Sequence, residues 1–180
     1  TKREDITLSA GIALIKPKFP IAKGAELSEA AEKAAKNHAI FGLTKNALCF
    51  LDIPVHWDKE FPIVCELKQK FTEWIDNKII TRGLLRKILE YYLVYRDKPG
   101  DLSWKWHAAY TIGRYQEGLD PLKRAQDQTK WDVLCKLKKL LFCYQFDDYT
   151  GIRMDAVALA ARWTEYHLRT FSKSKKNEQN

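Results

Sequence analysis

The sequence has few residues that break regular structure and few that react chemically. Its 180 residues include 8 glycines, 6 prolines, 4 cysteines and 1 methionine. The low glycine and proline content favours long helices. No apolar run approaches the roughly 20 residues that a membrane-spanning helix needs. We therefore expect no contact with a membrane.

The cysteines lack the spacing of a metal site or of a disulfide framework. No Cys-x-x-Cys pair occurs, and the 4 histidines are not paired with Cys49, Cys65, Cys135 or Cys143. We expect buried free thiols in a reducing cytoplasm, and no metal site. Gly-x-Ser-x-Gly, His-Glu-x-x-His, P-loop and Gly-x-Gly-x-x-Gly motifs are also absent, so the sequence gives no support for classical catalysis.

Positive charge is in excess. The chain has 31 Lys and Arg against 23 Asp and Glu, a formal net charge of +8. A basic domain suggests a polyanionic partner such as nucleic acid. The excess is spread along the chain, so a diffuse basic surface remains the alternative.

The first 56 residues predict a strand–helix–strand unit. Residues 6–15 alternate bulky apolar residues with small or polar ones, as in a strand with two different faces. An alanine-rich helix is predicted at about 22–39 and a second strand at about 46–51. Such a unit leaves sheet edges open and buries little apolar surface. We expect the other strands to lie upstream in a longer protein or on a partner chain.

From Trp57 onward the sequence shows no strand pattern. Apolar periodicity predicts helices at about 59–77, 82–96, 102–116, 121–145 and 152–171. The polar end of the sequence is expected to fray.

Short motifs in the first 57 residues resemble a known family. They are Leu8-Ser9-Ala10-Gly11-Ile12, Lys18-Phe19-Pro20-Ile21, Ala34-Ala35-Lys36 and Lys45-Asn46-Ala47-Leu48, followed by Trp57. Their order resembles the final part of the palm domain of GGDEF-type nucleotide cyclases. It more closely resembles the second palm of the large, Csm-type subunit of type III CRISPR effector complexes. The stretch from residue 57 is similar to that subunit's C-terminal helical domain in length and order.

The resemblance implies an α+β fold that is mostly α. A partial ferredoxin-like palm, made of the strand–helix–strand unit, would be followed by an all-helical bundle. The implied domains are an incomplete palm at 1–56, a helical domain at 57–172 and a frayed tail at 173–180.

The resemblance also implies a place in an RNA-guided antiviral complex. That family senses foreign RNA through a guide RNA and converts ATP into cyclic oligoadenylates, with Mg or Mn held by a Gly-Gly-Asp-Asp hairpin. Many members also carry an HD nuclease domain. This sequence has neither the hairpin nor an HD pair, so by itself it is expected to bind no cofactor and make no cyclic nucleotide. The implied partners are the rest of the palm, other effector subunits including small helical ones, and guide and target RNA.

The same resemblance implies nucleotide contacts at Ser9, Gly11, Lys36 and Lys45. Ser9 and Gly11 would let a base or ribose approach the sheet, and the two lysines would contact phosphate. The residues alone leave other interpretations open. Ser9 and Gly11 would also suit tight packing beneath another element, Lys36 would pair with Glu32 four residues earlier, and Lys45 would be merely solvated.

Two further residue sets are candidates for contact with RNA or a partner. The first is a set of basic residues that would form a stripe on one long helix, or simply its wet face: Lys123, Arg124, Lys136 and Lys139. The second is a set of rings among basic residues, which would stack on bases or form core: Trp104, Trp106, Tyr110, Tyr115, Trp131 and Trp163.

Two other functions stay open. A standalone basic helical protein for RNA binding or assembly would bind RNA with strong salt dependence and need no ATP. The C-terminal end of a GGDEF-like cyclase would prefer GTP and use no guide RNA.

Overall fold

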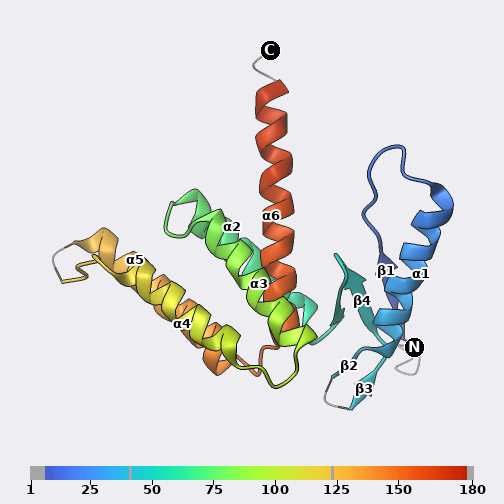
Figure 1. Ribbon diagram of the computed structural model, residues 1–180, viewed down its shortest axis with the longest axis horizontal. Helices are drawn as coiled ribbons and strands as arrows, with labels where there is room; N and C mark the ends of the chain where they lie inside the picture. Colours follow the sequence, from blue (N-terminus) through green and yellow to red (C-terminus); the bar gives the residue numbers. More distant parts are fainter. Residues whose placement is uncertain (1–6, 41, 123, 178–180) are drawn as a thin grey trace, which may run out of the picture. The chain divides into compact units, whose positions relative to one another are not determined.

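A computed structural model of the chain describes residues 7–40, 42–122 and 124–177 (Figure 1). Within these ranges lie six α-helices and seven short strands, so the predicted α+β, mostly α fold class is confirmed. The chain divides into two compact units, Thr1–Val64 and Cys65–Asn180. The sequence places the boundary at 56/57, whereas the two units divide inside helix α2 (Phe61–Asp76). In the described ranges no helix is both long and apolar enough to cross a membrane.

The first unit contains the predicted strand–helix–strand arrangement. Its elements are β1 (Ala10–Ile12), α1 (Ile21–Asn37), the short hairpin β2 (Ala39–Ile40) and β3 (Leu43–Thr44), β4 (Ala47–Phe50) and β5 (Ile53–His56). The three-stranded sheet has the order β1-β4-β5. Strands β1 and β4 are parallel, so the chain between them must cross back over the sheet, and α1 makes most of that crossing. The first predicted strand is much shorter than expected, and its first residue lies outside the described ranges.

Strand β5 was not predicted from the sequence. It pairs antiparallel with β4 and contains Pro54, which is tolerated because β5 lies at the sheet edge. The turn between the two strands is Leu51-Asp52, with φ values of 53° and 62°. A two-residue hairpin turn of type I′ needs positive φ at both positions, which usually selects Asn-Gly, Asp-Gly or Gly-Gly. Leu51-Asp52 is none of these pairs, so the sequence carries no hairpin signal at this point.

Helix α1 lies unusually close to the sheet. A Cβ atom added at Gly11 would lie 2.3 Å from the backbone nitrogen of Glu32 and 2.6 Å from the backbone carbon of Ala31. The small residues Ala31, Ala35, Ala47 and Cys49 form the buried cluster between the helix and the sheet. Because none of these side chains is large, the main chain of α1 can rest directly on β1.

The second unit is built almost entirely of helices. After α2 come α3 (Arg82–Asp97), α4 (Ser103–Gln116), α5 (Ala125–Lys138), the π-helical segment η1 (Lys139–Cys143), the hairpin β6 (Gln145–Phe146) and β7 (Tyr149–Thr150), and α6 (Met154–Asn177). The five predicted helices are present. The predicted 121–145 helix instead begins at Ala125 and changes to π-helix at Lys139. Helix α6 continues into the segment expected to fray.

Two sequence predictions are wrong in detail. The β6–β7 hairpin means that the unit is not all-helical; its strands are two residues long, too short to leave an alternating pattern. The four cysteines are not all buried: Cys49 is buried, Cys65 and Cys135 are half-buried and Cys143 is exposed.

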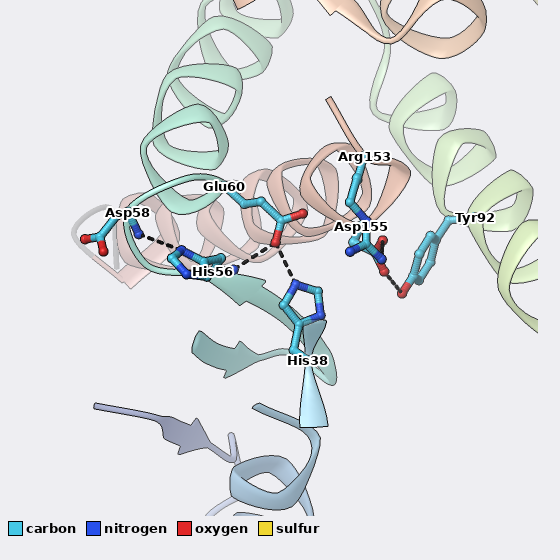
Figure 2. Close-up of polar contacts among 7 residues, drawn as sticks. All are labelled: His38, His56, Asp58, Glu60, Tyr92, Arg153 and Asp155. Atoms are coloured by element: carbon cyan, nitrogen blue, oxygen red, sulfur yellow. Dashed lines mark hydrogen bonds and ion pairs between the residues drawn. The ribbon is translucent and has the colours of Figure 1, made fainter. Parts of the chain in front are cut away.

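A polar contact joins α3 to α6 inside the second unit. The hydroxyl of Tyr92 donates to Asp155 Oδ1 at 3.1 Å, and Arg153 pairs with the other carboxylate oxygen at 3.2 Å (Figure 2). Burial is the largest cause that raises the pKa of Tyr92 far above its usual value, and the Asp155 carboxylate adds to it. The Tyr92 hydroxyl therefore stays protonated and acts as a donor.

The close contact at Gly11 predicts a large effect of a single methyl group. Gly11→Ala should lower the free energy of unfolding by about 1–3 kcal/mol, because the added Cβ meets α1 main chain that cannot move by itself. Urea denaturation followed by circular dichroism measures this. Gly83→Ala is the matched control, since its Cβ would meet only Thr81 Oγ1 at 3.6 Å. An unchanged stability for Gly11→Ala would show that α1 is not held against β1.

Cysteine exposure predicts a fixed order of alkylation. Burial raises the pKa of the Cys49 thiol to about 11, so at pH 8 it is neutral as well as shielded. Iodoacetamide should therefore modify exposed Cys143 first and leave Cys49 intact in the folded protein, as read by peptide mass spectrometry. Early modification of Cys49 would contradict its position under α1.

Candidate functional site

Three of the four residues predicted to contact nucleotide lie at one end of the first unit. Strands β1 and β4 are parallel, so Ser9, just before β1, and Lys45, just before β4, lie where both strands begin. Helix α1 runs back alongside β1 (Figure 1). Lys36 is in the last turn of α1 and therefore lies at the same end. We call this the strand-start end. Gly11 lies within β1, beneath α1.

A set of hydrogen bonds closes the strand-start end. Strand β5 ends at His56, which pairs with Ala47, so Trp57 is also here. The indole nitrogen of Trp57 donates to the Leu8 carbonyl at 3.0 Å, and its backbone N–H donates to the Asn46 carbonyl at 3.0 Å. The Asn46 amide donates to Asp58 Oδ2 at 2.6 Å. These contacts join the starts of β1 and β4 to the turn before α2.

Three residues not predicted for this site form a buried polar cluster beside it (Figure 2). His38 Nε2 lies 2.7 Å from Glu60 Oε2, and both side chains are about 5% exposed or less. The same carboxylate oxygen accepts the backbone N–H of His56 at 2.8 Å. The His56 ring nitrogen Nδ1 accepts the backbone N–H of Asp58 at 3.3 Å. The end of α1 is thus bound to the start of α2.

The predicted lysines are exposed, and one already has a partner. Lys36 Nζ lies 2.6 Å from Glu32, and its side chain is 54% exposed. Lys45 is exposed in a turn with φ of 66°. Exposed ammonium groups can bind phosphate as mobile point charges. Whether these two do so stays a prediction, although the Glu32 pair of the alternative interpretation is present.

Ser9 and Gly11 are better explained by packing than by an approaching base. The space above Gly11 is filled by α1 main chain. Ser9 is two residues away, and its hydroxyl is buried with no hydrogen-bond partner among the described residues. Nucleotide contact by either residue stays a prediction.

Of the four basic residues predicted for RNA or partner contact, the structure describes Arg124, Lys136 and Lys139. Lys136 and Lys139 line the same small hollow of about 150 Å³, where Lys136 pairs with Asp147 at 2.8 Å. Arg124 precedes α5 and pairs with Asp127 at 3.7 Å. It is about 18 Å along the helix from Lys136. Lys123 lies outside the described residues.

The His38–Glu60 pair left little signal in the sequence. His38 continues the alanine stripe of α1 and reads as a core residue, and its partner lies 22 residues later. Only the four-residue spacing from His56 to Glu60 hints at a local contact. Within the described ranges, no three His, Cys, Asp or Glu side chains are grouped so that they could hold a metal ion.

Comparison with known proteins gives one informative similarity. Over 96 residues, covering 47% of this chain, the sequence is 32% identical to the CRISPR system single-strand-specific deoxyribonuclease Cas10/Csm1 (subtype III-A) of Methanocaldococcus jannaschii. The matched stretch spans 12% of that relative's length. No family model and no solved structure matches the chain. The resemblance to a Csm-type large subunit is thereby confirmed.

The buried pair predicts a strong dependence of the first unit on His38. His38→Ala should lower the free energy of unfolding by about 3 kcal/mol, because it leaves the buried Glu60 carboxylate without its histidine. Urea denaturation followed by circular dichroism measures this loss of stability. Lys33→Ala, which breaks an exposed pair with Glu29, should cause no measurable change. Equal stability of the two variants would contradict an anchoring role for the pair.

Proposed function

We propose that this chain is part of the large subunit of a type III CRISPR effector complex. The observation that carries the proposal is the similarity to Cas10/Csm1 of subtype III-A. In this proposal the first unit supplies closing strands of a palm, and the second unit is a helical assembly surface near guide and target RNA. The activity, substrates and partners of the whole relative are part of the proposal.

The exposed apolar residues at β1 support a sheet that continues with strands from another part of the protein or from a partner chain. Ile12 of β1 is 44% exposed, and Leu8 and Leu14, which flank the strand, are 68% and 58% exposed. Ile12 follows Gly11, which faces α1, and so points to the other side of the sheet. Strand β1 also lies at the edge of its sheet within the described residues. An apolar face beside an open strand edge is where further strands would pair and be covered. The remaining part of a palm fits that requirement.

The strand-start end is the proposed wall of an ATP pocket. Lys36 and Lys45 would contact phosphates there, and Ser9 would be close to them. Gly11 would act indirectly, by letting α1 approach so closely that Lys36 is placed beside the strand starts. The Gly-Gly-Asp-Asp hairpin that would hold the divalent metal is missing from this sequence. Metal binding is therefore assigned to the rest of the palm.

The first test is isolation of the native protein from its source cells. We expect a larger complex that carries this chain together with repeat-derived guide RNA, read by mass spectrometry of the intact polypeptide and by RNA sequencing. A free 21.0 kDa protein without guide RNA would overturn the proposal in favour of a standalone helical RNA-binding or assembly protein.

The ATP wall has its own test in the purified complex. Lys36→Ala should lower kcat/KM for ATP conversion by about tenfold, because a charged contact to phosphate is lost. Lys33→Ala is a matched control: it is one turn earlier on α1 and has the same type of pair, with Glu29 at 2.7 Å. An equal effect of the two variants would remove Lys36 from the wall.

A further inference from the structure

The structure separates the rings of the second unit into buried and exposed ones. Trp104 is 2% exposed and belongs to the core. Trp106 is 78% exposed and Tyr110 is 69% exposed, although both are on the same helix, α4. The two are four positions apart, so their side chains are neighbours on one face of the helix. Large rings this exposed call for an explanation that core packing does not provide.

The exposed rings belong to a continuous apolar face. Residues at helical spacing run along the outer side of α4, and we call them the α4 stripe: Leu102, Trp106, Ala109, Tyr110 and Gly113. The opposite side of the helix is buried through Trp104, Ala108 and Ile112. Helix α4 is therefore apolar on two sides, one of them facing solvent. A continuous exposed apolar stripe marks a binding surface more often than isolated exposed residues do.

The charges around the α4 stripe are of one sign on the helix itself. Helix α4 contains Lys105 and Arg114 and no acidic residue. The Lys105 ammonium lies 5.6 Å from the centre of the Trp104 ring, and Arg114 lies one residue after Gly113 of the stripe. Rings flanked by cations match a strand that offers bases and phosphates together.

A groove continues the stripe at the end of α4. It has a volume of about 430 Å³ and is lined by Tyr110, Gly113, Arg114, Gln116, Glu117 and Trp131. A Cβ added at Gly113 would have nothing within 4 Å, so the floor of the groove is open. Arg114 pairs with Glu117 at 3.0 Å, and both side chains are more than 60% exposed. The groove thus offers two rings, a guanidinium and a carboxylate.

We propose that the α4 stripe and this groove bind single-stranded RNA by stacking bases on Trp106 and Tyr110. The two rings are about 6 Å apart along the helix axis, so successive unstacked bases can each lie on one ring. Lys105 and Arg114 contact the phosphates, and Trp131 covers a base in the groove. The proposal rests on the proposed function in that it names where that complex holds single-stranded RNA.

Glu117 favours RNA over DNA as the occupant. Its carboxylate repels phosphate, so its presence beside Arg114 does not suit a site for phosphate alone. It is, however, an acceptor that a ribose 2′-hydroxyl can donate to, and DNA has no such donor. The groove therefore distinguishes two strands that differ in nothing but this hydroxyl.

Binding of oligouridylate and oligodeoxyuridylate of about 12 nucleotides to the purified 180-residue chain tests the proposal by fluorescence anisotropy. Oligouridylate should bind about threefold more tightly than its deoxy counterpart. Trp106→Ala and Tyr110→Ala should each weaken RNA binding at least about fivefold. Glu117→Ala should reduce the preference for RNA, mainly by tightening DNA binding.

Two matched variants guard against unspecific effects. Leu93→Ala removes an exposed apolar side chain from α3, and Lys70→Gln breaks a Lys70–Glu73 pair with the same three-residue spacing as Arg114–Glu117. Both should bind oligouridylate like the unaltered chain. Trp106→Ala with normal circular dichroism and unchanged RNA affinity would overturn the proposal. DNA binding as tight as RNA binding would overturn RNA as the occupant.

The outcomes separate this proposal from the proposed function. Guide RNA that co-purifies with the native complex, combined with unchanged affinity of Trp106→Ala, overturns the α4 stripe alone. Absence of guide RNA from the native protein overturns the CRISPR assignment. The binding of oligouridylate to the purified chain and its Trp106→Ala variant still decides whether the α4 stripe binds RNA.

Discussion

The first unit depends on the contact between the main chain of α1 and Gly11 of β1. A residue with a Cβ at this position would push the helix away from the sheet, because the nearest atoms are backbone atoms of Ala31 and Glu32. The close approach also sets which side chains can lie between the two elements, and alanine dominates there. Lys36 and His38 follow at the end of the same helix. Their positions at the strand-start end are therefore a consequence of a missing side chain at residue 11.

The buried His38–Glu60 pair supplies what the small helix–sheet interface lacks. Alanine contacts bury little apolar area per residue. They set the distance between α1 and the sheet, but they hold the rotation of the helix and the position of its last turn only weakly. A charged or strongly polar bond of 2.7 Å in a buried place fixes one point on the last turn of α1. Glu60 also accepts the His56 N–H, so the same carboxylate ends β5 and begins the turn to α2. The two contacts together hold the strand-start end in one arrangement.

The parts of this fold that follow from repeating patterns could be predicted from the sequence, and the parts that depend on single contacts could not. The helical periodicity of residues such as Leu85 and Ile88 marks α3 without knowledge of its neighbours. Strand β5 was invisible because it contains Pro54 and follows a turn of Leu51-Asp52 rather than Asn-Gly. The pair of His38 and Glu60 joins residues distant in sequence, and no local pattern reports such a pair. The motifs that resemble the Csm-type subunit predict a role for Lys36 and Lys45, but they give no sign of the His38–Glu60 pair.

Net charge alone is a poor guide to where this protein would bind a polyanion. The +8 charge is spread over the chain, and many of its lysines and arginines are paired with nearby carboxylates. Lys136 and Lys139, which looked like part of a basic stripe, share a small hollow with Asp147. The α4 stripe differs because it presents exposed rings, and Trp106 is more exposed than any other tryptophan that the structure describes. Stacking on such rings supplies free energy that salt does not screen, and the flanking cations need only hold the backbone in place. A site of this kind is found from the exposure of its aromatic residues rather than from the count of its charges.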